Sequence, residues 1–242
     1  MRSTFKILIL LVVLLTVGAA QAGEPLFARM DTDAGAILLV FYPELAPHHV
    51  DNFVHLSRTG YYDETKFHRI VPGFVIQGGD ANSKDADPRN DGMGSPMMTD
   101  VLNDKELELV AEVNKMLEAN GYAGLNGQAN LKAEFSKTAK HGTGSLSMAR
   151  SQDVDSAGSQ FFICVGPTPQ LDGSYTIFGQ VVMGQEVAQS IVSAEKNPAA
   201  GRDAPAVPVA INRVTIIEGT DDLSDAEKAA WEALPAELKN VK

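Results

Sequence analysis

The chain has 242 residues and a formal net charge of −11 at pH 7. Such an acidic chain repels phosphate backbones, so we expect no nucleic-acid partner. Its one cysteine, Cys164, excludes an internal disulfide, and the length suffices for one sizeable hydrophobic core.

The first 22 residues have the pattern of a secretory signal peptide. Arg2 and Lys6 are followed by an apolar run at 7–17, and Ala-Gln-Ala at 20–22 has the small-x-small pattern of a cleavage site. A span of the bilayer takes about 20 residues, so this run is short for one. An uncleaved membrane anchor is the alternative. We expect cleavage after Ala22, which changes the net charge from −11 to −13 and leaves the protein without membrane attachment.

Short strands dominate the rest of the chain. Two apolar segments predict helices: one opens at Pro47 and ends at Gly60, and one covers 184–193. Many short strands with two core helices indicate an all-β barrel or sandwich. The segments with strand character are 26–32, 35–43, 66–71, 74–79, 144–150, 160–166, 175–182 and 209–219.

Two further helices stand apart from this pattern. Asn103 and Glu106 form a capping-box pattern at the start of a helix over 103–121, which Gly121 ends. Its apolar stripe must pack somewhere, and we expect it beside the substrate site. The C-terminal tail repeats the capping pattern with Ser224 and Glu227. We divide the chain into a signal peptide at 1–22, a domain at 23–219 with an insertion at about 96–130, and a helical extension at 220–242.

Arg69 raises a chemical question, because it stands in the apolar stretch FHRIVPGFVIQGGD at 67–80. A guanidinium cannot lose its proton to suit such surroundings. It therefore extends to water, pairs with an acid, or is held there for chemistry.

This stretch resembles the signature of the cyclophilins, the peptidyl-prolyl cis/trans isomerases. The blocks GTGSLSMAR (142–150), GSQFFI (158–163) and LDGSYTIFGQV (171–181) follow in that family's order, and the resemblance covers roughly 26–95 and 130–218. It implies a mainly β fold, a closed eight-stranded antiparallel barrel capped by two helices, with the groove on its outer wall. We also expect no cofactor, no metal, a monomer, and substrates that are unfolded or partly folded proline-containing polypeptides.

The resemblance assigns roles by position. Arg69 is expected to act on the prolyl peptide bond. Gln77 and Gln160 resemble groove residues that bind the substrate backbone, and Ala149 with Arg150 resembles an extended main chain that receives the peptide. The proline pocket is expected to be walled by Phe74, Val75, Phe162 and Leu171, with Tyr175 and Phe178 completing its rim. Read singly, Phe74 and Phe162 could be plain core, and Gln77 could merely satisfy buried backbone groups.

Physical chemistry fits this assignment. Rotation about Xaa-Pro has a barrier near 18–20 kcal/mol because the C–N bond has partial double-bond character. A fixed cation that hydrogen-bonds the prolyl nitrogen, whose lone pair is free only in the twisted amide, lowers that barrier. We therefore expect a prolyl isomerase for exported proteins; the alternative is a chaperone or binding module that holds proline segments without useful catalysis. The run ARSQDVDS (149–156) with Tyr175 resembles bacterial exported forms, which favours the periplasm, with secretion second.

Overall fold

The computed structural model describes residues 24–120, 127–200, 203–239 and 241. The signal peptide expected at 1–22 and the helix stop expected at Gly121 lie outside these ranges. Within them, no helix is both long and apolar enough to cross a membrane.

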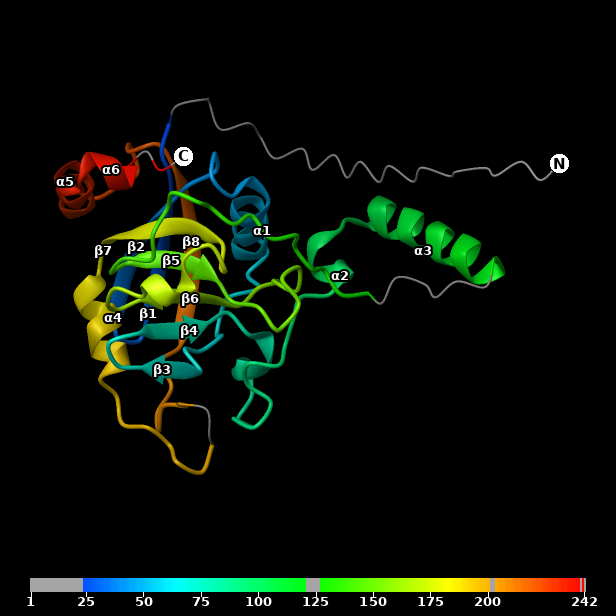
Figure 1. Cartoon of the computed structure of the whole chain (residues 1–242), viewed down its shortest axis with the longest axis horizontal. Coiled ribbons are helices and arrows are strands. Elements are labelled where there is room, and N and C mark those ends of the chain that lie inside the picture. The colour runs from blue at the N-terminus through cyan, green and yellow to red at the C-terminus, as the bar shows by residue number, and fades with distance from the viewer. Residues whose placement is uncertain (1–23, 121–126, 201–202, 240, 242) are drawn as a thin grey trace.

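Eight antiparallel strands form one curled sheet, so the prediction of a mainly β fold is confirmed (Figure 1). The strand order is β3-β4-β6-β5-β7-β2-β1-β8. Every predicted strand segment overlaps one of these strands. Their bounds are β1 Leu26–Thr32, β2 Gly35–Phe41, β3 Arg69–Val71, β4 Val75–Gly78, β5 Ser145–Met148, β6 Phe161–Cys164, β7 Ile177–Met183 and β8 Ile211–Glu218.

The sheet is an open half-barrel, so the prediction of a closed barrel is wrong. The strand order ends at β3 and β8, which do not pair with each other. The segment before β3 approaches the start of β8 instead: the Phe67 N–H donates to the Val209 carbonyl at 3.0 Å, and the Ile211 N–H donates to the Thr65 carbonyl at 2.7 Å. Prolines at 205 and 208 supply no N–H. A regular ladder therefore cannot continue along this seam.

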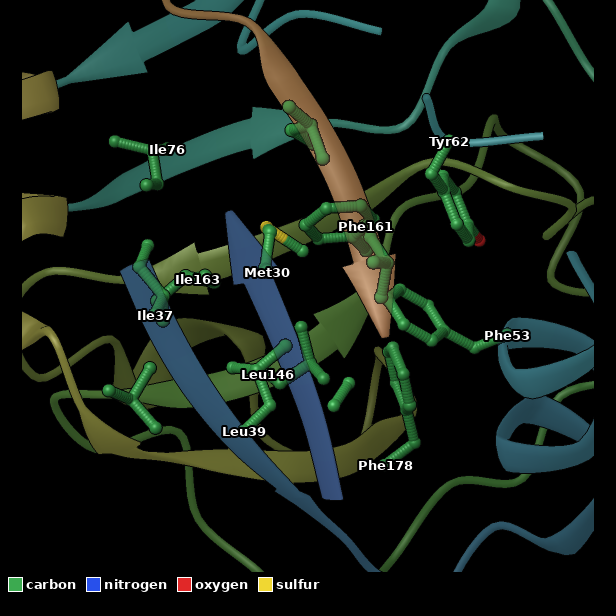
Figure 2. Packing of buried hydrophobic residues seen from close by; sticks show 14 of the residues in the cluster. Met30, Ile37, Leu39, Phe53, Tyr62, Ile76, Leu146, Phe161, Ile163 and Phe178 are labelled. Carbon is green, nitrogen blue, oxygen red and sulfur yellow. The ribbon is translucent and has the colours of Figure 1, made fainter. Parts of the chain in front are cut away.

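Two helices cover the sheet, as the sequence predicts. Helix α1 (Pro47–Arg58) packs against β7 and β8, and α4 (Gln185–Val192) packs against β2, β3 and β4. Pro47 lies in the first turn of α1, where its missing N–H costs nothing. The side chain of Phe53 reaches from α1 into the core toward Phe161 and Phe178 (Figure 2), with ring centroids 5.4 and 5.6 Å away. This aromatic packing fills the concave side of the sheet.

Helix α3 (Asp104–Ala119) projects from the body of the molecule (Figure 1). Its predicted capping box is confirmed, since the side chains of Asn103 and Glu106 each accept the other residue's backbone N–H. None of its residues is buried, and Leu109 and Met116 are 51% and 57% exposed. The expectation that the helix docks beside the substrate site is therefore wrong. A short helix, α2 (Met98–Val101), joins it to the body.

The C-terminal tail covers the convex face of the sheet. Helix α5 (Asp225–Ala233) begins with the predicted Ser224–Glu227 capping box, and a short α6 (Ala236–Lys239) follows Pro235. The Trp231 ring meets Phe27 of β1 edge-on at 5.1 Å. The tail is thus part of the folded body, with its own apolar cluster against the strands.

Candidate active site

Strand register places the central site residues in one row. Arg69 of β3 is paired with Gln77 of β4, Gln77 is paired with Phe162 of β6, and Phe162 is paired with Ser147 of β5. Residues directly opposite each other on neighbouring strands project from the same face of a sheet. The hairpin that begins the row closes through Pro72-Gly73, where Gly73 has φ +73°, a value that favours glycine.

A chain of hydrogen bonds fixes the polar part of this row. Arg69 Nη1 donates to Gln77 Oε1 at 3.3 Å, Gln77 Nε2 donates to Gln160 Oε1 at 3.0 Å, and Gln160 Nε2 donates to the Gly94 carbonyl at 2.8 Å. Arg69 remains 35% exposed, and Asp203 Oδ2 lies 3.9 Å from its Nε. The guanidinium is therefore oriented from one side and open to a ligand on another.

An apolar cluster lies next to this polar chain. Val75, Phe162 and Cys164 are buried in it, and Phe74, Ala149, Leu171 and Tyr175 pack against them in part. The Tyr175 ring meets Phe162 edge-on at 5.7 Å. The structure thus brings together the predicted pocket residues Phe74, Val75, Phe162, Leu171 and Tyr175.

A cavity of about 1030 Å³ opens beside this cluster. The predicted residues that line it are Arg69, Gln77, Ala149, Arg150 and Gln160. The Ala149 N–H is already used, because it donates to the Gln160 carbonyl at 2.8 Å. Polar groups thus converge on a concave site that adjoins an apolar cluster. Small-molecule sites usually combine apolar surfaces with a few convergent polar groups.

Phe178 lies elsewhere, and its assignment to the rim is wrong. It is fully buried in the core behind the strands, 6.3 Å from Phe41 and 5.6 Å from Phe53 between ring centroids (Figure 2). Successive residues of a strand face opposite sides of the sheet. In β7 the outward neighbour of Phe178 is Ile177, which joins the tail's cluster.

A loop forms one wall of the cavity, a role that sequence reasoning did not predict. Residues 88–89 and 91–95 line it, as do Gln128 and Asn130 from the other end of the insertion. Asp80, fully buried, holds this loop: its carboxylate accepts hydrogen bonds from the backbone N–H groups of Asn82, Gly92 and Gly94. The polar, Gly-rich composition of 81–95 predicts a loop, but it does not predict that the loop lies against the site.

A second missed group supports Phe162 from behind. The buried His141 ring stacks on Phe162 at 6.1 Å. Its Nδ1 lies 3.1 Å from Asp172 Oδ1, and its Nε2 lies 3.1 Å from Ser147 Oγ. Burial lowers the pKa of His141 although Asp172 opposes the shift, so the ring is neutral at pH 7. Asp172 stands inside the quoted block at 171–181 and His141 directly precedes another, which was the available signal.

Arg69 supplies a cation at the start of the row. Burial lowers the pKa of its neighbour His68, which keeps that imidazole neutral. No cluster of three or more metal-ligating side chains occurs in the described part of the chain. The site can hold an apolar ring, hydrogen-bond a peptide backbone through two glutamines, and present one oriented guanidinium.

Comparison with known proteins identifies the family. The model of the family described as cyclophilin type peptidyl-prolyl cis-trans isomerase/CLD matches residues 27–216. Peptidyl-prolyl cis-trans isomerase cypE of Dictyostelium discoideum is 37% identical over 192 residues, which cover 79% of this chain and 94% of that protein. Peptidyl-prolyl cis-trans isomerase A of the bacterium Dickeya dadantii is 32% identical over 222 residues, covering 86% and 97%.

A solved structure agrees with these relatives. The cyclophilin type peptidyl-prolyl cis-trans isomerase of Cryptosporidium parvum, crystallised in the presence of the dipeptide Ala-Pro, superposes with a TM-score of 0.60 at 26% identity. The match covers 79% of this chain and 98% of that one. The row from Arg69 to Phe162, the curled eight-stranded sheet and these matches lead to one conclusion: the chain belongs to the cyclophilin-type peptidyl-prolyl cis-trans isomerases.

Proposed function

We propose that the chain accelerates rotation about Xaa-Pro bonds in exported proteins, with Arg69 as the catalytic residue. The observation that carries the proposal is the placement of Arg69. Its guanidinium is held by Gln77 at 3.3 Å, remains 35% exposed, and stands in register with Phe162 of the apolar cluster.

The mechanism is electrostatic and forms no covalent bond. A proline ring packs against Phe162, and the two glutamines hold the substrate backbone. As the C–N bond twists, the prolyl nitrogen regains its lone pair, and an Arg69 N–H donates to it. That hydrogen bond exists chiefly in the transition state, which is the condition for raising the rate rather than only the affinity. The apolar walls exclude water and strengthen it.

The cellular location of the protein and of its substrates forms a separate part of the proposal. The pattern at 1–22 supports export, and the periplasm is the proposed compartment, with secretion second. Fractionation of cells that express the full chain tests this: mature protein beginning at Gly23 in the periplasmic fraction is expected. Full-length protein in the cytoplasmic fraction would contradict it.

The catalytic role is tested by Arg69→Ala in a protease-coupled assay on a short Xaa-Pro peptide. We expect a loss of roughly two to three decades in kcat/KM, about the loss that follows removal of one oxyanion-hole donor. Arg69→Lys should also be impaired, because an ammonium lacks the planar fork of the guanidinium. Arg58→Ala is the control, since Arg58 pairs with Glu218 on the surface.

The outcomes separate the enzyme from its alternative. A folded Arg69→Ala protein with near-normal turnover would rule out the assigned role. Wild-type protein that binds the peptide but gives only the uncatalysed rate would establish the alternative, a chaperone or binding module for proline-containing segments.

A further inference from the structure

Arg150 is fixed at the wall of the cavity by its own side chain. It follows β5, and its Nε and Nη2 donate to the Ser174 carbonyl at 3.0 and 2.9 Å, while Nη1 donates to the Ser151 carbonyl at 2.9 Å. The guanidinium carbon lies 4.6 Å from the Tyr175 ring centroid and 5.8 Å from that of Phe135. Carbonyl oxygens and aromatic faces orient a cation without neutralising it.

The charge of Arg150 has no carboxylate partner within the described ranges. The other two arginines that line the cavity do have one: Arg69 lies 3.9 Å from Asp203, and Arg89 lies 2.8 Å from Asp87. The protein has 31 acidic and 20 basic residues, so acids are abundant, yet none of the described ones forms an ion pair with Arg150. The guanidinium has five N–H groups, and three are used.

The acids on the loop after Arg150 are engaged elsewhere. Asp153 Oδ1 accepts the Asp155 N–H at 3.0 Å, and Asp155 Oδ1 accepts the Ala133 N–H at 2.9 Å. They brace the loop instead of pairing with the arginine.

We propose that the Arg150 side chain selects substrates with an acidic residue close to the proline. This inference rests on the proposed function and adds a preference to it. Tyr175 contacts both the Arg150 guanidinium and the Phe162 ring, so one aromatic ring separates the cation from the apolar cluster. An extended chain advances about 3.3 Å per residue, which places the selected acid within about three residues of the proline.

The test uses short peptides of one sequence in which a single position carries Glu, Gln or Lys. That position is moved from three residues before the proline to three after it. At the most responsive position we expect kcat/KM for the Glu peptide to exceed that for the Lys peptide by about tenfold at low salt, since one peptide charge is attracted and the other repelled, each changing the rate by a few-fold. Added salt should reduce the ratio.

Three variants test whether the charge of Arg150 causes the difference in kcat/KM between the Glu and Lys peptides. Arg150→Gln should bring the Glu/Lys ratio close to one, and Arg150→Lys should retain part of it. Arg58→Gln removes the same charge from a surface pair away from the cavity and should leave the ratio unchanged.

The Glu/Lys ratio of kcat/KM distinguishes substrate selection by Arg150 from a purely structural role in which Arg150 only holds the Tyr175 ring in place. If Arg150→Gln lowers kcat/KM on every peptide by one common factor, Arg150 is only a structural clamp and the inference fails. A wild-type ratio near one at every position also refutes it. Absence of turnover on all peptides would instead refute the proposed function.

Discussion

The ion pair between Glu227 and Arg29 should hold the C-terminal tail on the sheet. Arg29 Nε and Nη2 donate to the two carboxylate oxygens at 2.6 Å each, and the backbone N–H and hydroxyl of Ser224 donate to Oε2 at 2.8 Å. The Glu227 side chain is 3% exposed, and that of Arg29 is 28% exposed. Replacing Glu227 by Gln removes the charge while keeping the shape of the side chain.

The size of the effect follows from the pKa of Glu227. Its hydrogen bond to Arg29 lowers that pKa from 4.5 to about 2. Since one pKa unit is 1.36 kcal/mol, the gap corresponds to roughly 3 kcal/mol, and partial exposure of Arg29 reduces this to about 2 kcal/mol. The folded pKa is the lower one, so this stabilisation is complete above about pH 4.5 and is lost as the pH falls toward 2. The variant should therefore be less stable at pH 7, and the difference should vanish near pH 2.

Trp231 makes the assay specific, because it is the only tryptophan and lies on the tail against Phe27. Its fluorescence reports release of the tail during urea unfolding, and far-ultraviolet circular dichroism reports loss of the sheet. Glu218→Gln is the matched control: Arg58 and Glu218 also lie 2.6 Å apart, but their side chains are 46% and 53% exposed, so we expect less than about 1 kcal/mol. Equal effects of the two variants at pH 7 would refute the reasoning.

Three more predictions follow from burial. Replacing 102–125 by a short Gly/Ser linker should preserve the fold and the turnover of short peptides, because α3 buries no side chain. The chain on either side of the replaced segment is already close, since the Met98 N–H donates to the Gly127 carbonyl at 2.7 Å; loss of cooperative thermal unfolding would contradict this. Cys164 should not react with thiol reagents in the native protein, because burial raises its pKa to about 11, and labelling at the same rate in native and unfolded protein would be inconsistent with that. The folded state should lose stability as the pH falls below about 6.5, because burial lowers the pKa values of His68 and His141 and the unfolded chain binds their protons first; urea midpoints that are equal at pH 7.5 and 5.5 would argue against this.

Local sequence patterns were sufficient to predict most of the helices and strands. The capping boxes at Asn103 and Ser224 are contacts within one turn, and both are present in the structure. The resemblance to the family also placed Arg69, Gln77 and Phe162 together, and the strand register explains why residues so far apart in the sequence meet. The misplacement of Phe178 was avoidable, because alternation along β7 sends Ile177 and Phe178 to opposite faces.

Other features depend on contacts between distant segments. Closure of the sheet would need β3 and β8 to pair, and the strand pattern of each was correct although the pairing does not occur. The apolar stripe of α3 predicted an amphipathic helix, but a stripe does not specify what it packs against. The cavity wall at 88–95 depends on the buried Asp80, whose partners Gly92 and Gly94 are 12 and 14 residues further on.

The short stretch Gln77-Gly78-Gly79-Asp80 shows why these features occur together. Gln77 stands in the row between Arg69 and Phe162, and only three residues later Asp80 lies beneath the loop that forms a wall of the cavity. A side chain at Gly78 would meet the Phe67 ring at 3.2 Å, and one at Gly79 would meet the Ser159 carbonyl at 2.6 Å, in a backbone with φ +82°. Glycine at both positions therefore lets the backbone turn sharply between Gln77 and Asp80. The same four residues therefore orient the guanidinium of Arg69 and fix the wall of the cavity that its substrate would enter.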